Sequence, residues 1–168
     1  MEKPVYAPEG KKPTGETPFH VRIMRKRPDI KAIVHAHPPI LTGFSIAGSG
    51  LLQKPFLPEP ILEVGPIMSV AYDTPLSEQF DRVIDLSDGF LMENHGALFC
   101  SPFSITDAVE RLQMTECMAH SILVASLLGN AKPIADKYVK EIDEVIKIRN
   151  LPMPGKPGLF SSISMMYH

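Results

Sequence analysis

Two histidines in a β-branched apolar segment place the strongest constraint on how this chain can fold. His35 and His37 end the run Ile33-Val34-His35-Ala36-His37, and Pro38-Pro39 follows at once. In a strand, side chains two residues apart point to the same face. Both imidazoles would then lie close enough to grip one divalent metal ion. A histidine on a half-buried strand is more commonly a polar residue without a ligand, so the pair alone leaves that alternative open.

A third histidine follows a second short apolar run. His95 stands in Glu93-Asn94-His95-Gly96-Ala97, directly after Phe90-Leu91-Met92. Three protein ligands with one open coordination position are the arrangement of a catalytic zinc rather than a structural one. The spacing and context therefore predict a metal site with His35, His37 and His95 as ligands. Such a metal could polarise a carbonyl or enediolate oxygen, or lower the pKa of a bound water.

Length and composition bound the class of protein. The 168 residues suffice for one domain with a core, so a single domain over 1–168 is expected, with 150–168 as a Pro/Gly-rich tail. The net charge of −2 gives no reason to expect nucleic acid. No apolar stretch approaches a membrane span, and the N-terminus lacks the apolar core of a signal peptide. Cys100 and Cys117 lack CxxC spacing, so free thiols in a cytoplasmic protein are expected.

Strand and helix patterns alternate along the chain. Strands are expected over 31–37, 67–72, 90–93 and 96–100, and helices over 17–27, 39–47, 75–86, 104–128 and 133–149. Thr17 and Ser104 are the expected N-caps of their helices. Residues 51–66 are rich in proline and are expected to be irregular. The alternation predicts an α/β or α+β layered domain whose strands are few and short.

The best candidate for moving a proton lies just before the first helix. Glu16 stands in Lys12-Pro13-Thr14-Gly15-Glu16, a Gly-containing turn next to the helix N-terminus. Such turns present backbone N–H groups and favour anions such as phosphate. A carboxylate there could act as a base while Thr14 and Gly15 help to hold a phosphate. The competing interpretation is that Glu16 only stabilises the start of the helix.

Taken together, these motifs resemble the class II aldolase/adducin family, whose zinc-dependent sugar-phosphate members include fuculose-phosphate aldolase. The order and spacing agree with the family from about residue 11 to about residue 130. The matching stretches are residues 12–20, Arg27-Pro28-Asp29, residues 32–37 and Asn94-His95-Gly96-Ala97.

The resemblance implies a three-layer α/β/α domain with a mostly antiparallel central sheet. It implies zinc, or another divalent metal such as Mn²⁺ or Co²⁺, on the three histidines. Glu16 would move the proton at the substrate carbon, and Thr14 and Gly15 occupy the place of the family's phosphate-binding serines. The implied activity is a cytoplasmic aldolase that cleaves a sugar phosphate, such as a ketose 1-phosphate, through a metal-stabilised enediolate.

The chain departs from the family pattern in two places. The family carries a longer segment before its equivalent of Lys12 than the eleven residues found here. The chain is therefore expected to lack the family's N-terminal part, and to form a homo-oligomer (a tetramer) or to join a companion chain that supplies that part. Residues 54–65, where the aldolases carry a catalytic tyrosine, contain none, and Tyr167 in the tail is a loose substitute.

Several functions share the same expected metal site. A sugar-phosphate epimerase, dehydratase or decarboxylase of the family would also pass through a metal-stabilised enolate, so the ligands alone do not separate these reactions from aldol cleavage. Each would act on a small phosphorylated carbonyl substrate. The alternative outside the enzymes is a non-catalytic, adducin-like association module.

Overall fold

A mixed β-sheet forms the centre of the structure, a computed structural model that describes residues 9–71 and 78–168. Within these ranges the strand order is β1-β4-β3-β2. The strands are β1 (Ala32–Ala36), β2 (Met68–Val70), β3 (Gly89–Met92) and β4 (Gly96–Ser101). β4 pairs antiparallel with both β1 and β3, whereas β2 runs parallel to β3. The sheet is thus mostly antiparallel, as expected, with one parallel pairing.

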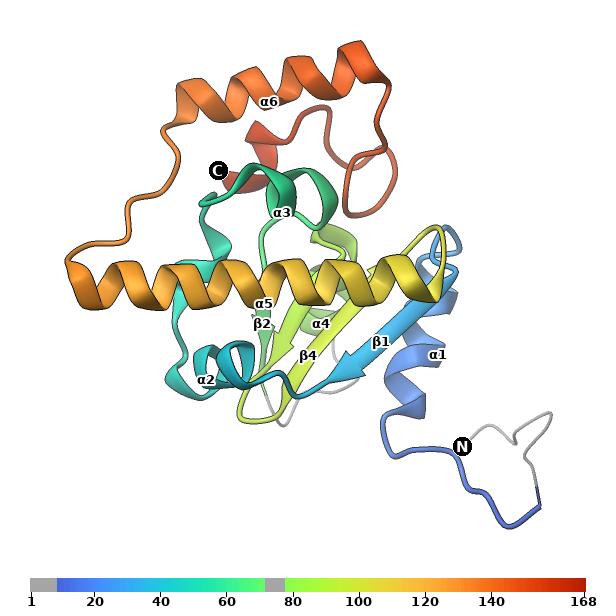
Figure 1. Cartoon of the computed structure of the whole chain (residues 1–168). Coiled ribbons are helices and arrows are strands. Elements are labelled where there is room, and N and C mark those ends of the chain that lie inside the picture. Colours follow the sequence, from blue (N-terminus) through green and yellow to red (C-terminus); the bar gives the residue numbers. More distant parts are fainter. Residues whose placement is uncertain (1–8, 72–77) are drawn as a thin grey trace.

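Helices cover both faces of the sheet. They are α1 (Thr17–Lys26), α2 (Pro39–Ala47), α3 (Pro58–Glu63), α4 (Glu78–Leu86), α5 (Ile105–Leu128) and α6 (Asp136–Arg149), with short 3₁₀ helices η1 (Gly50–Gln53) and η2 (Ser164–Tyr167). Figure 1 shows α5 lying across the sheet, with α6 beyond it. Within the described ranges, no helix is both long and apolar enough to cross a bilayer.

The alternation of side chains along the strands builds two separate cores. On β4, Ala97 and Phe99 pack with α2 and α5, whereas Leu98 and Cys100 pack with α1 and α4. Successive side chains on a strand point to opposite faces, so each strand residue belongs to one core. The result is the expected three-layer α/β/α arrangement, in which α1 and α4 form one outer layer and α2 and α5 the other.

Residues 51–66 are not irregular, which corrects the expectation from their proline content. They contain η1 and the six-residue helix α3. Pro58 and Pro60 lie in the first turn of α3, where a missing N–H removes no intrahelical hydrogen bond. Pro60 and Ile61 are buried. A helix of six residues is too short to show an apolar periodicity, so the proline content is the only local pattern that its sequence presents.

Most helix ends lie within one residue of the expected ones; the start expected at residue 75 lies outside the described residues. The N-cap of α1 is Glu16 rather than Thr17. Ser104 caps α5 as expected, because its hydroxyl accepts from the N–H of Asp107 at 3.1 Å. α6 begins at Asp136, slightly after the expected Pro133. The one-residue offset of α1 is within the ordinary fraying of helix termini, whereas α6 begins three residues later than expected.

The C-terminal residues are packed against the domain. In Figure 1 they lie between α6 and α3. Ile163 is fully buried in a third apolar cluster with Ile61, Val139 and Ile146. Asp143 of α6 accepts hydrogen bonds from the backbone N–H of Ile163, at 2.6 Å, and from that of Ser164. The tail is therefore a structural part of the molecule.

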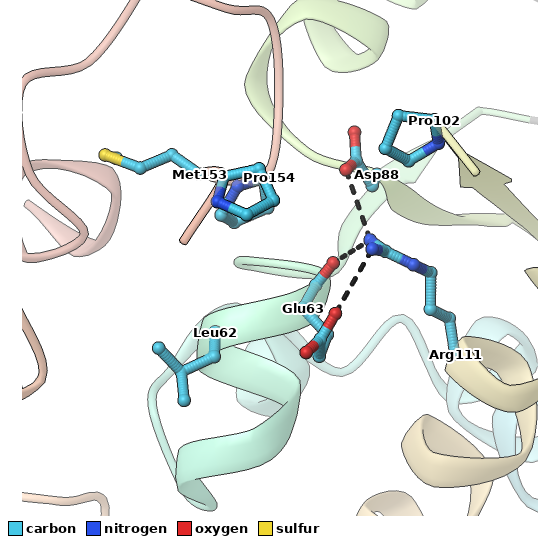
Figure 2. Close-up of a pocket in the computed structure, with 8 residues that line it drawn as sticks. Leu62, Glu63, Asp88, Pro102, Arg111, Met153 and Pro154 are labelled. Atoms are coloured by element: carbon cyan, nitrogen blue, oxygen red, sulfur yellow. Dashed lines mark hydrogen bonds and ion pairs between the residues drawn. The ribbon is translucent and has the colours of Figure 1, made fainter. Parts of the chain in front are cut away.

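A buried ion network joins the layers at the end of the sheet away from the histidines. Asp88 accepts from Arg27 at 2.9 Å and from Arg111 of α5 at 3.3 Å, and the backbone N–H of Gly155 in the tail donates to it. Figure 2 shows Arg111 reaching both Asp88 and Glu63. The pocket beside it has a volume of about 10 Å³, which suits one water molecule and no substrate.

Both cysteines are free thiols, as expected. Cys100 is buried in β4 and Cys117 is exposed on α5. Burial in the apolar core raises the pKa of the Cys100 thiol far above its usual value. It therefore stays protonated at neutral pH and acts as a small apolar side chain.

Candidate metal centre

The structure brings His35, His37 and His95 together. One ring nitrogen from each lies within 4.8 Å of the others, and the ring centroids are 4.8–5.0 Å apart. The Nε2 atoms of His35 and His37 are 3.1 Å apart. His37 is exposed, whereas the other two rings are half-buried. The cluster is thus open to solvent, as a site for a small substrate must be.

Strand register explains why distant histidines meet. A three-residue loop joins β3 to β4, with Asn94 in the left-handed region at φ 53°. Such a loop turns the chain tightly and places His95, its last residue, directly before β4. Because β1 runs antiparallel to β4 and pairs Ala36 with Ala97, the end of β1 lies beside that start. His35 projects from β1 to the sheet face that carries α1.

The residues present fit a divalent metal ion. His35 Nδ1 lies 3.1 Å from the carbonyl oxygen of Ala97, so an N–H there donates to the carbonyl and leaves Nε2 free for a metal. Burial lowers the pKa of His35, as do the neighbouring histidines, which favours the neutral imidazole that a metal requires. Three imidazole nitrogens, one of them on a ring oriented by a carbonyl, match the donor set of an open zinc site.

Glu16 lies beside this cluster. Its Oε1 atom is 3.8 Å from Nε2 of His95, and the Thr14 hydroxyl donates to its Oε2. That hydrogen bond is the main cause that lowers the pKa of Glu16, and a hydrogen bond from its own backbone N–H adds to it. Glu16 is therefore an ionised carboxylate at neutral pH, suited to accepting a proton.

The Thr14–Gly15 turn is exposed immediately ahead of α1. The Thr14 carbonyl accepts from the backbone N–H and the hydroxyl of Thr17. A phosphate here would lie close to Glu16, because the same Thr14 hydroxyl already serves that carboxylate. A role for Thr14 and Gly15 in binding phosphate stays a prediction.

Among the described residues, the other histidines and Tyr167 are not part of the histidine cluster. His20 is half-buried near Glu16; burial lowers its pKa and the Glu16 carboxylate raises it. His120 is exposed on α5. Tyr167, the loose candidate for a catalytic acid, packs in the third apolar cluster beside α6, and burial raises its pKa. The structure thus packs Tyr167 against its own domain, and its role as a catalytic acid stays a prediction. Tyr72 lies outside the described residues.

Sequence reasoning missed one residue near the centre. Glu116 of α5 binds the backbone at the start of α2, two and three residues after Pro38. Its partners are 75 and 76 residues away in the chain, so no local pattern indicates the contact. The Arg27-Pro28-Asp29 stretch has a structural role instead, since Arg27 is buried in the ion network.

A larger pocket than the one beside Arg111 lies elsewhere. It has a volume of about 390 Å³ and is an apolar groove between α2 and α5. These helices cover the sheet face opposite to the one that His35 occupies. The groove therefore does not open on the metal centre.

Comparisons with known proteins agree with this fold. The model of the Class II Aldolase and Adducin N-terminal domain matches residues 2–123. The chain belongs to this family. A 3-oxo-tetronate 4-phosphate decarboxylase of Pectobacterium atrosepticum is 32% identical over 130 residues, which cover 73% of this chain and 58% of that protein. The chain thus spans about three-fifths of the length of this curated relative.

Solved structures show the same architecture. YgbL from Klebsiella pneumoniae matches 79% of this chain and 67% of its own, with a TM-score of 0.66 and 28% identity. A sugar-phosphate aldolase from Thermotoga maritima matches 73% of this chain and 58% of its own, with a TM-score of 0.62 and 26% identity.

Proposed function

We propose that this chain carries the metal centre of a carbon–carbon lyase that acts on a small phosphorylated carbonyl compound. The observation that carries the proposal is the convergence of three histidine nitrogens with the ionised carboxylate of Glu16. A divalent ion held by His35, His37 and His95 supplies positive charge for substrate oxygens. We further propose zinc as that ion, because a three-nitrogen donor set suits it.

Glu16 is the group that we assign to proton transfer. When a bond next to a carbonyl breaks, its electron pair moves onto the carbonyl oxygen and leaves an enediolate. A proton must then add to the carbon that lost its substituent. Glu16 delivers that proton after taking one up, and in the reverse direction its carboxylate removes the proton from the same carbon.

Decarboxylation is our first candidate for the bond that breaks. A relative at 32% identity is named 3-oxo-tetronate 4-phosphate decarboxylase. Loss of CO₂ from such an acid leaves the enediolate of dihydroxyacetone phosphate, and one proton added to carbon completes the product. The reaction needs an electron sink and one proton carrier, and the histidine cluster with Glu16 can provide both.

Aldol cleavage of a ketose 1-phosphate is the second candidate. The sugar-phosphate aldolase with the same architecture supports it. This cleavage leaves the same enediolate but also requires a base for the hydroxyl on the departing carbon. Tyr167 packs beside α6 and is not part of the histidine cluster, so the described part of this chain offers no obvious base for that step. Release of CO₂ from a 3-oxo acid phosphate, or of an aldehyde from a ketose 1-phosphate, distinguishes the two reactions.

Hydrogen exchange tests the step that both candidates share. In D₂O with zinc and dihydroxyacetone phosphate, the protein should exchange a proton of the hydroxymethyl carbon, as followed by NMR. Glu16→Gln should keep the fold and bound metal while slowing exchange by roughly 10²–10⁴-fold. Glu110→Gln, an exposed change on α5, is the matched control and should exchange normally. Normal exchange by Glu16→Gln would reject the assigned role.

A further inference from the structure

The segment between His37 and α2 has neither strand pairing nor a local helix cap to fix its position. β1 ends at Ala36, so His37 lies beyond the last paired residue of the strand. Pro38 and Pro39 follow, and neither has a backbone N–H to donate. Pro38 is the N-cap of α2 but makes no side-chain cap, and the first turn of α2 contains no acidic residue.

A side chain from α5 supplies what this junction lacks. Glu116 Oε1 accepts from the N–H of Ile40, and Oε2 accepts from the N–H of Leu41, both at 2.8 Å. These are the first two N–H groups of α2, which have no acceptor within the helix. The carboxylate also places its negative charge at the positive end of the helix. Both oxygens are thereby used, and Glu116 is outside the histidine cluster.

The three histidines are held to different degrees. His35 is inside the β1–β4 ladder and its Nδ1 contacts the Ala97 carbonyl. The N–H of His95 donates to the Met92 carbonyl within the tight loop. His37 is exposed and follows the ladder, so its direction depends on the segment that continues into α2.

We propose that Glu116 is a positioning residue of the metal centre, which holds His37 in place by clamping the start of α2 to α5. The inference rests on the proposed metal centre. Glu116 acts through the backbone of the segment that follows His37, whereas the sheet holds only the residues that precede it. A purely structural role would stabilise α2 without changing the affinity for metal, and this difference makes the two roles separable.

Metal affinity of matched variants provides the test. Co²⁺ binding would be measured by competition with a chelator and by the visible spectrum, alongside circular dichroism and thermal unfolding. Glu116→Ala should weaken Co²⁺ binding at least about tenfold and alter the spectrum. Glu116→Gln keeps one acceptor oxygen and should fall between it and the native chain.

Ser104→Ala is the control because it removes a different helix cap, that of α5. It should lower thermal stability without changing Co²⁺ affinity. If Glu116→Ala folds and binds Co²⁺ within twofold of the native affinity, the positioning role alone is overturned. If Glu116→Ala does not fold, the same result in Glu116→Gln overturns it. A native chain that binds no Co²⁺ overturns both this role and the proposed metal centre.

Discussion

Gly96 lies where any side chain would collide with the metal centre. A Cβ atom at this position would be 2.4 Å from Cδ2 of His37 and 2.6 Å from the carbonyl oxygen of Ala36. Both distances are shorter than ordinary van der Waals contacts. The glycine is needed here for close approach of β1 and β4, since its φ is not in the left-handed region.

We predict that Gly96→Ala displaces the His37 ring and weakens metal binding by one order of magnitude or more. The backbone oxygen of Ala36 cannot move without breaking the strand pairing, so the ring and the loop must shift. Isothermal titration with zinc would measure the effect. Gly43→Ala is the control, because a Cβ there has nothing within 4 Å. Equal zinc affinity in the two variants would contradict the prediction.

Arg27 is the most enclosed charge in the molecule's described part. It is 1% exposed and donates to Asp88, to Asp29 and to the carbonyl oxygen of Ile84. Burial raises the pKa of Asp88 to about 6, although Arg27 and Arg111 act to lower it. Asp88 is thus ionised at pH 7, and its charge is offset by the two arginines.

Arg27→Ala should therefore destabilise the fold by about 3 kcal/mol at pH 7, because a buried carboxylate and a carbonyl lose their partner. Without Arg27 the pKa of Asp88 rises further, so the folded state takes up a proton that the unfolded state lacks. Stability then increases as pH falls, and the gap to the native chain should narrow from pH 7 to pH 5. Urea unfolding at both values measures this gap. Lys26→Ala, the control at a partly exposed residue, should lower the free energy of unfolding only slightly.

At the scale of elements, local patterns predicted β1, α2 and α5 well. Each of these elements has a signal that spans only a few residues: the β-branched run for β1, Pro38-Pro39 for α2 and the Ser104 cap for α5. The helix α3 was missed because six residues show no period. The His35–His37 pair was predictable for the same local reason, whereas the approach of Glu16 to His95 came only through the family resemblance.

An acidic side chain of α6 holds the last turn of the tail by hydrogen bonds. Asp143 is 7% exposed and accepts from the N–H of Ile163, and from both the N–H and the hydroxyl of Ser164. We predict that Asp143→Ala raises amide exchange rates at Ile163 and Ser164 at least tenfold, because about 1–3 kcal/mol of local stability is lost per unpaired buried group. Hydrogen exchange with mass spectrometry would detect it. Glu144→Ala, on the exposed side of α6, should leave these rates unchanged.

At the scale of the whole molecule, the contacts that the sequence alone could not predict are those between residues far apart in the chain. Asp88 meets Arg27 across 61 residues, and Glu116 meets Ile40 across 76. No periodic pattern or cap signal links positions so far apart, because each partner is locally an ordinary residue of a helix or loop, and Ile40 takes part only through its backbone N–H. The predicted homo-oligomer or companion chain also stays a prediction, which light scattering on the purified chain would test.

Metal binding should stabilise the entire domain, because the three histidines join β1 to the loop between β3 and β4. An ion that binds only the folded state adds about 2.7 kcal/mol at a free concentration of 100 times its Kd. For a chain of this size, that free energy corresponds to a rise in melting temperature of roughly 5–10 °C. Differential scanning fluorimetry with and without zinc would measure the shift, and a chelator should reverse it.

His95→Ala decides whether that stabilisation comes from this site. The substitution removes one ligand from the loop and leaves both strands intact, so the protein without metal should melt close to the native chain. Zinc should then add little stability, because the two remaining nitrogens both belong to β1 and its immediate end and no longer join separate segments. His120→Ala, an exposed change on α5, should retain the full response. An undiminished zinc-dependent shift in His95→Ala would place the stabilising ion elsewhere on the molecule.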